Sequence, residues 1–445
     1  MNILLVGSGA REHAVARAFK KSRLVPSKIE GSNPKLFCFA SNNNPGISKI
    51  SDGFLVGKID NKEEILNFAK ENHVELAFIG PEAPLEAGVA DLLWENDIKV
   101  VGPKKLHAQL ETSKAFTRDL FDEFNISGGA KHQNFNSIQG VEEFLNKLGE
   151  EGYVVKADGL MGGKGVKVAG DHLKNINEAV EYCEELIEKK SDFIIEEKFI
   201  GQEFSLMSFC DGDSLAHMPV VQDHKRAFEG DCGPNTGGMG TYSDANHSLP
   251  FLTLDDIKQA QEINTATAKA LKEKFGTGYL GVLYGGFIAT ETGVSLIEYN
   301  ARLGDPEAMN VMAILESDFV ELCLAITNSD LTQEHAKFAN KATVCKYVVP
   351  EGYPDSPIKN KKIDISEVEN QDQLYLASVE EKDGELYELG SRTAAVVGIA
   401  DTIEEAEQAA EAEILKIKGP LFHRKDIGTK ELIQKRIDMM KDLRK

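Results

Sequence analysis

The stretch Asn2-Ile3-Leu4-Leu5-Val6-Gly7-Ser8-Gly9-Ala10-Arg11-Glu12 opens the chain and decides how its first part folds. Residues 2–6 are an almost continuous apolar run, which is typical of a strand buried on both faces. A turn with two glycines follows, and Arg11–Lys20 then carries apolar residues at helical spacing. Because a strand, a tight turn and a helix in this order form the first half of a βαβ unit, we expect a parallel sheet.

The next ninety residues continue the alternation of strands and helices. Further strands are predicted at Leu36–Ala40, Val74–Ile79 and Lys99–Val101, and further helices at Lys62–Glu71 and Leu85–Glu95. The pair Gly102-Pro103 ends this pattern. We therefore predict an N-terminal parallel α/β domain over residues 1–103.

The Gly7–Glu12 turn is predicted to bind a phosphate group but not a dinucleotide. Glycines between a strand and a helix let the backbone approach an anion at the helix N-terminus. The dinucleotide fingerprint needs a third glycine, where this chain has Glu12, and an acidic residue after the second strand, where it has Ser41–Asn44. A dehydrogenase is therefore disfavoured, while an ordinary strand–turn–helix junction stays open.

The middle and the end of the chain follow a different pattern, with strands in hairpin order. The predicted strands are Tyr153–Ala157, Val166–Ala169, Phe193–Glu197, Glu203–Phe209, Leu215–Val221, Tyr279–Ala289 and Val294–Tyr299. A helical stretch at Pro306–Thr327 leads to a third block with strands at Thr343–Val349, Gln373–Val379 and Arg392–Val397 and a helix at Ile403–Lys416. Consecutive strands with turn signals indicate antiparallel pairing, so we predict α+β structure here.

A second glycine-rich loop, Lys156-Ala157-Asp158-Gly159-Leu160-Met161-Gly162-Gly163-Lys164-Gly165, lies between two predicted strands. It differs from the Walker A loop, because Gly165 stands where that motif has Ser or Thr and a strand follows instead of a helix. Backbone N–H groups and lysines in such a flap can fold over the phosphates of a nucleotide. A hairpin tip without a ligand is the alternative.

Two further segments combine charge with polar oxygens. Along Ile297–Arg302 the polar side chains Glu298, Asn300 and Arg302 alternate with apolar ones, so a strand would present them on one face. Carboxylate and amide oxygens are ligands that Mg²⁺ takes beside nucleotide phosphates. The run Asp223–Gly240 has neither strand nor helix periodicity, and a loop of that length within a domain is usually functional.

Composition excludes several classes of protein. The chain has 445 residues and a net charge of −22, which argues against partners that are extended polyanions and against anionic membranes. No apolar run approaches the ~20 residues of a membrane span, and we expect no signal peptide at the start. Six scattered cysteines fit reduced thiols in a cytoplasm. We expect about three domains and a cytoplasmic enzyme for small molecules.

Six motifs in one order resemble those of the phosphoribosylamine–glycine ligase family of the ATP-grasp superfamily. They are Val6–His13, Gly80–Leu85, Val155–Gly159, Asp223–Arg226, Gly233–Gly240 and Arg302–Glu307. The resemblance implies three parts: a pre-ATP-grasp sheet over 1–103, an ATP-grasp domain over 104–328 with a lid at about 123–192, and a C-terminal α+β domain over 329–445. The fold class expected is thus multidomain, α/β and α+β.

The resemblance also implies a reaction and its ligands. Phosphoribosylamine, glycine and ATP would give glycinamide ribonucleotide, ADP and phosphate through a glycyl phosphate intermediate, with Mg²⁺ or Mn²⁺ as the metal. No nucleic acid and no membrane are expected as partners, and the expected state is a monomer or a weak dimer.

Site residues are carried over from the resemblance by position. Those implied for ATP are Lys114, Lys156, Gly159, Gly162, Gly163, Lys164, Glu196, Glu197 and Glu203, and those implied for the metal are Glu298 and Asn300. Those implied for the sugar phosphate are Gly9, Glu12, Pro81, Glu82, Asn235, Thr236 and Gly237, and those implied for catalysis are Arg302, Asp305, Lys225 and Arg226.

The chain departs from the family pattern at Ala10, Ser41–Gly46, Ala227–Glu229 and Leu376–Ser378, so the resemblance assigns no contact to Ser41–Gly46 and no role to the third block. Two other functions stay open: another ATP-grasp carboxylate–amine ligase with a different acceptor, and a nucleotide-binding regulatory protein without turnover.

Overall fold

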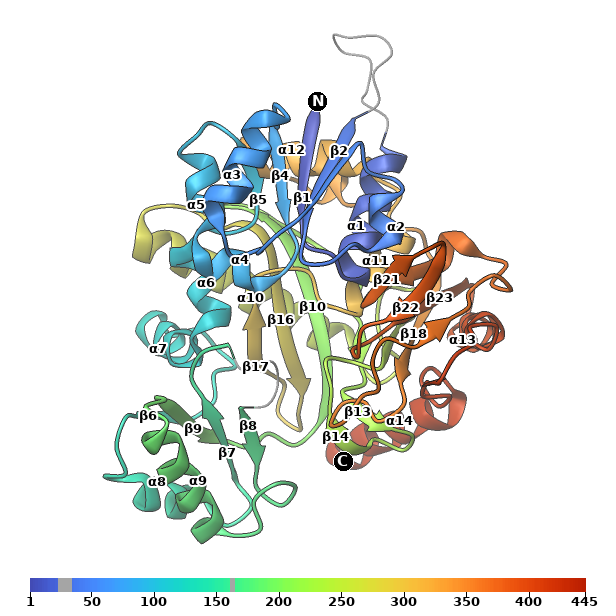
Figure 1. The fold of residues 1–445 in the computed structure, drawn as a ribbon. Coiled ribbons are helices and arrows are strands. Elements are labelled where there is room, and N and C mark those ends of the chain that lie inside the picture. The colour runs from blue at the N-terminus through green and yellow to red at the C-terminus, as the bar shows by residue number, and fades with distance from the viewer. Residues whose placement is uncertain (23–33, 161–164) are drawn as a thin grey trace.

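The computed structural model describes residues 1–22, 34–160 and 165–445. Three parts surround one elongated central sheet (Figure 1). The N-terminal sheet lies at one end, the strands β6–β9 form a separate lobe at the other end, and the C-terminal domain lies at the side. This arrangement confirms the predicted fold class. Within the described ranges, no helix combines the length and the apolar character that crossing a membrane requires.

The N-terminal sheet is parallel throughout, with the order β3-β2-β1-β4-β5. Its strands are β1 (Asn2–Val6), β2 (Lys35–Ala40), β3 (Gly53–Val56), β4 (Leu76–Ile79) and β5 (Lys99–Val101). The sequence predicted four of them and missed β3, a four-residue edge strand with no fully buried residue.

Helices cover both faces of this sheet, which explains the unbroken apolar character of β1. Leu4 and Val6 pack with residues of α3 (Lys62–Glu71) and α5 (Val89–Trp94), while Ile3 and Leu5 belong to the core that contains α1 (Ala10–Lys21). The predicted helix 85–95 is in fact two helices, α4 (Glu82–Ala87) and α5, because Gly88 at φ +81° breaks it. A short helix, α2, spans Pro45–Ser48.

The lobe at the lower left of Figure 1 is an antiparallel sheet of order β6-β9-β7-β8 with two helices on it. Its elements are β6 (His132–Phe135), α8 (Val141–Leu148), β7 (Tyr153–Ala157), β8 (Val166–Val168), α9 (Ile176–Glu188) and β9 (Phe193–Glu197). It follows α6 (Lys105–Thr112) and α7 (Lys114–Phe124). The loop between β7 and β8 carries residues 161–164, which lie outside the described residues.

The central antiparallel sheet has the order β11-β10-β16-β17. Its elements are β10 (Gln202–Asp211), β11 (Leu215–His217), α10 (Leu254–Phe275), β16 (Leu280–Ala289), β17 (Val294–Asn300), α11 (Glu307–Ala313) and α12 (Phe319–Asn328). The predicted helical stretch 306–327 is therefore two helices. The second one, α12, returns to the N-terminal sheet, where Phe319 packs against Phe19 at a ring distance of 4.8 Å.

The C-terminal sheet, of order β12-β15-β18-β23-β20, takes two strands from the middle of the chain. Its strands are β12 (Gln222–Asp223), β15 (Gly240–Ser243), β18 (Ala342–Pro350), β20 (Leu374–Leu376) and β23 (Ala394–Ala400), with β24 (Leu421–Phe422) beside β18. A second small sheet holds β19 (Lys362–Ile363), β21 (Val379–Lys382) and β22 (Glu385–Glu388), and the helices are α13 (Ile403–Ile414) and α14 (Lys430–Leu443).

Two predictions for this region were wrong. The run 223–240, predicted to lack strands, contains the hairpin β13 (Arg226–Phe228) and β14 (Cys232–Asn235) and joins the C-terminal sheet at both ends. Its strands are two to four residues long, too short for a period to show in the sequence. The predicted strand 373–379 splits into β20 and the start of β21, which pair in different sheets.

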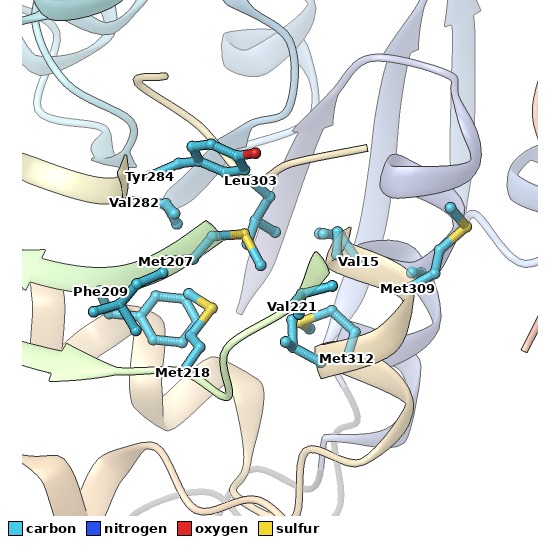
Figure 2. Close-up of a cluster of buried hydrophobic side chains, with 14 of the residues drawn as sticks. Val15, Met207, Phe209, Met218, Val221, Val282, Tyr284, Leu303, Met309 and Met312 are labelled. Carbon is cyan, nitrogen blue, oxygen red and sulfur yellow. The ribbon is translucent and has the colours of Figure 1, made fainter. Parts of the chain in front are cut away.

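One buried core joins the N-terminal and central parts. Figure 2 shows Val15 of α1 near Met309 and Met312 of α11, with Met207 of β10 and Leu303 beside them. All five side chains are buried. Leu303 anchors the loop 301–306 in this core, so the polar residues of that loop are held by a well-packed segment.

Candidate active site

Two predicted substrate loops meet at the point where the strand order of the N-terminal sheet reverses. The chain leaves β1 for β2 and β3 on one side, and β4 and β5 lie on the other side. The loop with Gly9 follows β1 and the loop with Pro81 follows β4, and β1 and β4 pair in parallel. Crevices at such switch points bind ligands in open α/β sheets, so the geometry agrees with the position predicted for these loops.

Glu12 organises these two loops from within. Its side chain is buried, Oε2 accepts a hydrogen bond from the Gly9 backbone N–H at 2.6 Å, and Oε1 accepts one from Nε of Arg11 at 2.5 Å. A Cβ built on Gly7 would lie 2.7 Å from Cγ of Glu12. The carboxylate therefore occupies the room that the glycines leave, which explains why Glu12 replaces the third glycine of a dinucleotide site.

The strand with the predicted metal ligands contains a β-bulge. Gly286 pairs with Glu298, but Phe287 pairs with Leu296, so Ile297 is an extra residue without a ladder partner. The carbonyl oxygen of Ile297 instead accepts hydrogen bonds from Nζ of Lys156 at 3.2 Å and from Nη2 of Arg118 at 2.8 Å.

Glu298, implied as a metal ligand, lies near Lys225, Lys156 and Lys114. Nζ of Lys225 is 3.5 Å from its Oε1, and the same ammonium is 3.9 Å from Glu203. Burial would raise the pKa of Glu298, but Lys225, Lys156 and Lys114 outweigh it and lower that pKa. In turn Glu298 raises the pKa of Lys225. The Glu298 carboxylate and the Lys225 ammonium are therefore charged at neutral pH.

Arg302 connects the metal strand to the N-terminal part. Its Nη2 donates to Oδ1 of Asn300 at 3.0 Å and pairs with Glu111 at 2.8 Å, and its Nε is 3.5 Å from the carboxylate of Glu82. Burial would raise the pKa of Glu82, and Arg302 lowers it below the usual range. Glu111, which the sequence analysis missed, also accepts the Ala301 N–H at 2.7 Å.

The residues at β17 fit a magnesium ion that is shared with a nucleotide. In residues 1–22, 34–160 and 165–445, no three His, Cys, Asp or Glu side chains are grouped to hold a metal by themselves. Glu298 and Asn300, two positions apart on β17, offer one carboxylate and one amide oxygen. Mg²⁺ is commonly held by one or two carboxylates together with substrate phosphates, so the donor set suits that role.

Lys156 and Glu196 form a buried cluster with Arg118. The ammonium of Lys156 pairs with Oε1 of Glu196, and Nε of Arg118 donates to Oε2 at 2.7 Å. Burial would raise the pKa of Glu196, but Arg118 and Lys156 lower it to about 2. Because these side chains are paired, and Glu197 accepts the N–H of Lys131 at 2.9 Å, the predicted role of residues 196 and 197 toward adenine rests on backbone groups.

The start of the glycine-rich flap is attached to α7. Asp158 accepts the backbone N–H of Lys114 at 2.6 Å and the hydroxyl of Ser113 at 2.9 Å, so it caps the helix N-terminus. Nζ of Lys114 donates to the carbonyl of Gly159 at 3.0 Å. Of the predicted flap residues, Gly162, Gly163 and Lys164 lie outside the described residues.

The hairpin residues divide between two neighbourhoods. Both the N–H and the hydroxyl of Thr236 donate to the carbonyl of Lys225, at 2.7 and 2.9 Å, and so hold the lysine beside Glu298. Arg226, which pairs with Asn235 in the hairpin, instead donates to Gly233 and to Asp171 of the lobe at 3.1 Å. Its hydrogen bonds among the described residues are thus away from the carboxylates of β17.

Asp305 stands between the glycine loop and the C-terminal domain. Its Oδ1 accepts the hydroxyl of Tyr347 at 2.7 Å and lies 3.4 Å from Nη2 of Arg392. A Cβ built on Gly9 would be 3.6 Å from Oδ2 of Asp305. Tyr347 and Arg392 were missed by the sequence analysis, since they lie in a block to which no role was assigned.

Two of the segments that depart from the family pattern, 41–46 and 376–378, contact each other. Nδ2 of Asn44 donates to the carbonyls of Ser8 and Leu376, both at 2.8 Å. Asn42 donates to the carbonyl of Val379 at 3.3 Å. The loop 41–46 therefore attaches the C-terminal domain to the glycine loop after β1.

Comparison with known proteins agrees with this architecture. Three family models match the chain: phosphoribosylglycinamide synthetase N domain over residues 1–111, its ATP-grasp (A) domain over 112–308 and its C domain over 343–430. The domain bounds predicted from the sequence, 1–103, 104–328 and 329–445, differ from these matched ranges and stay a prediction.

Relatives align over the whole chain. The phosphoribosylamine–glycine ligase of Methanosarcina acetivorans is 50% identical over 444 residues, covering 100% of this chain and 98% of its own, and that of Methanocaldococcus jannaschii is 50% identical with 100% of both chains covered. The solved structure of phosphoribosylamine–glycine ligase from Thermotoga maritima superposes with a TM-score of 0.80 at 29% identity, covering 96% of this chain and 100% of that one.

A more distant structure shares the fold alone. The biotin carboxylase domain of a 2-oxoglutarate carboxylase from Hydrogenobacter thermophilus, solved with MgADP, has a TM-score of 0.71 at 18% identity, over 99% of this chain and 94% of that one. The family models and the full-length relatives confirm the resemblance seen in the motifs. This chain belongs to the phosphoribosylglycinamide synthetase family.

Proposed function

We propose that this chain joins glycine to phosphoribosylamine at the expense of ATP, giving glycinamide ribonucleotide, ADP and phosphate in purine biosynthesis. The observation that carries the proposal is the juxtaposition of two half-sites. Glu298 with its lysines forms one half, and the switch-point loops form the other, with Arg302 in contact with Glu82 and Asp305 beside Gly9. The relatives that match the whole chain are named for this reaction.

The chemistry proceeds in two transfers. An oxygen of the glycine carboxylate attacks the γ-phosphorus of ATP, and the bond to the β–γ bridging oxygen breaks to release ADP and leave glycyl phosphate. The amine of phosphoribosylamine then attacks the acyl carbon, phosphate leaves, and the nitrogen loses a proton. No protein nucleophile is needed, so the residues act by positioning and by charge.

Different charged and polar side chains would act on different parts of the substrates. Lys114 and Lys156 face Glu298 and are placed for the phosphates of ATP, while Glu203 is placed for the ribose. Glu298 and Asn300 would hold Mg²⁺, which neutralises phosphate charge when bound. Arg302 and Asp305 are placed for glycine and the acyl phosphate, with Lys225 beside the transferred phosphoryl group. Arg226 would act only if the contact with Asp171 opens.

The sugar phosphate would lie across the switch point. Gly9 and Pro81 lie in the loops that follow the paired strands β1 and β4, and Glu12 and Glu82 are the acidic residues of these loops. Asn235, Thr236 and Gly237 complete the acceptor side. Manganese as an alternative metal, the cytoplasmic location, the monomer or weak dimer, and the absence of nucleic-acid and membrane partners stay predictions.

ADP release tests the function directly. With ATP and Mg²⁺ present, we expect ADP and glycinamide ribonucleotide to form only when glycine and freshly generated phosphoribosylamine are both supplied. Omitting each substrate in turn is the control. Product that forms with a different amine acceptor and not with phosphoribosylamine would contradict the proposal and favour another ATP-grasp ligase.

Gly80→Ala tests the acceptor side. A Cβ at residue 80 would lie 2.6 Å from Cγ and 2.7 Å from Cδ of Glu12, so the carboxylate must move and release the Gly9 N–H. We expect KM for phosphoribosylamine to rise about tenfold, as expected for the loss of one hydrogen bond to a charged group, while KM for ATP changes less than about twofold. Gly384→Ala is the control for substituting glycine itself: a Cβ there meets nothing within 4 Å, and the strain of a side chain at φ +78° should lower Tm without changing any KM. If Gly80→Ala and the parent have equal KM values for phosphoribosylamine, the glycine loops are not part of the acceptor site.

A further inference from the structure

The C-terminal domain reaches into the site through one arginine. Nη1 of Arg392 donates to the carbonyls of Gly237 at 2.5 Å, Gly238 at 3.2 Å and Asp305 at 2.8 Å. Its Nη2 lies 3.4 Å from Oδ1 of Asp305. One guanidinium from the third domain thus contacts two segments that lie 68 residues apart in the sequence, Gly237 and Asp305, both from the central part.

Tyr347 completes this contact. The guanidinium carbon of Arg392 lies 4.7 Å from the centre of the Tyr347 ring, and the hydroxyl of Tyr347 donates to Oδ1 of Asp305 at 2.7 Å. The two residues belong to neighbouring strands of one sheet, since Tyr347 is on β18 and Arg392 lies two residues before the start of β23. Because two donors from the C-terminal domain engage Oδ1, they orient the carboxylate so that Oδ2 faces Gly9.

We propose that Arg392, supported by Tyr347, is a positioning residue for the ligation: it fixes the carboxylate of Asp305 and the turn Gly237–Gly238 in one geometry. The inference rests on the proposed function. The Arg392 side chain is half-buried, 16% exposed, and the carbonyls to which it donates belong to the substrate segments and not to its own domain. Isolated burial of a charge is costly, so these contacts are what make its position tolerable.

The charge of Arg392 is secure in this setting. Burial alone would lower its pKa, but Asp305 and the nearby tyrosines Tyr347 and Tyr353 outweigh it and raise the pKa, so the guanidinium is charged at neutral pH. A planar fork can serve several acceptors at once, whereas an ammonium on a flexible stem cannot replace it. Arg392→Lys, which keeps the charge, is therefore as informative as Arg392→Met, which removes it.

Steady-state kinetics of Arg392→Met and Arg392→Lys test the proposal. For Arg392→Met we expect kcat to fall about 100-fold and KM for phosphoribosylamine to rise, because small displacements of positioning groups cost about that much. KM for ATP should stay within about twofold, since Arg392 makes no contact with the lysines around Glu298 in the described residues. Arg392→Lys should recover less than a tenth of the lost kcat.

Arg444→Met is the matched control. Arg444 makes a two-pronged pair with Asp256, at 2.8 and 2.7 Å, at a helix away from the site. Its loss should lower Tm without changing kcat or any KM. If Arg392→Met behaves in the same way, Arg392 is a packing residue and the proposal is wrong.

Tyr347→Phe keeps the test decisive if Arg392→Met does not fold. It removes one hydroxyl, and we expect kcat to fall about tenfold with KM for ATP unchanged, since one hydrogen bond to a carboxylate is lost. An unchanged kcat in this variant would overturn the positioning role. A parent protein that forms no glycinamide ribonucleotide would instead refute the proposed function, which separates the two failures.

Discussion

Glu298→Gln is expected to lower kcat by about 10³-fold while leaving the fold intact, an effect of the size seen when a preorganised charge is removed from a reaction centre. The amide has nearly the same shape as the carboxylate, so packing on β17 is kept. What is lost is the negative charge that faces Lys225 and is placed to hold the metal. The apparent requirement for Mg²⁺ should rise in parallel.

The measurement is kcat over a series of Mg²⁺ concentrations, with Tm recorded for each protein. Glu291→Gln is the matched control, because Glu291 is exposed in the turn of the same hairpin, Thr290–Gly293. It should leave both kcat and the Mg²⁺ requirement unchanged. Full activity of Glu298→Gln at ordinary Mg²⁺ would show that Glu298 is not a ligand.

Glu196→Ala is expected to destabilise the protein by about 3–5 kcal/mol, since it leaves the buried cations of Lys156 and Arg118 without their common partner. The measurement is urea-induced unfolding followed by circular dichroism. Glu197→Ala, at the next position, is the control: its partner Lys131 is 78% exposed, so its loss should cost at most about 1 kcal/mol. Similar losses in the two variants would contradict the buried cluster.

The same carboxylate predicts a pH dependence. In the folded protein, Arg118 and Lys156 lower the pKa of Glu196 to about 2, whereas in the unfolded chain the pKa lies near its ordinary value of 4.5. A lowered folded-state pKa contributes stability above pH 4.5, and that contribution is lost as the pH falls from 4.5 toward 2. The stability gap between the parent and Glu196→Gln should therefore narrow over this interval, and a gap that stays constant would oppose the assignment.

The elements that the sequence predicted well are those with strong local signals. β1 was read from an apolar run with helices expected on both faces, and both faces are indeed covered. The division at Gly88 and the edge strand β3 were missed, because a single glycine and a four-residue strand leave little periodicity to read. The hairpin in 223–240 was missed for the same reason, since its strands are only three and four residues long.

Within the site, the alternation of polar and apolar residues predicted Glu298 and Asn300 on one strand, and both lie on β17. The bulge at Ile297, which presents a carbonyl to Lys156, could not be predicted, because it depends on the register against β16. The sequence also could not predict that Arg226 pairs with Asp171, or that the Glu12 carboxylate accepts a hydrogen bond from the Gly9 N–H.

By itself the sequence determined the family, the parallel N-terminal sheet and the types of residue that carry the chemistry, since these depend on local periodicity and on the order of short motifs. Only the tertiary structure decided which groups meet: Asn44 with Leu376, Arg302 with Glu111, and Arg392 with Asp305. Such contacts join segments up to hundreds of residues apart, and their geometry follows from how three domains pack, which no local pattern encodes.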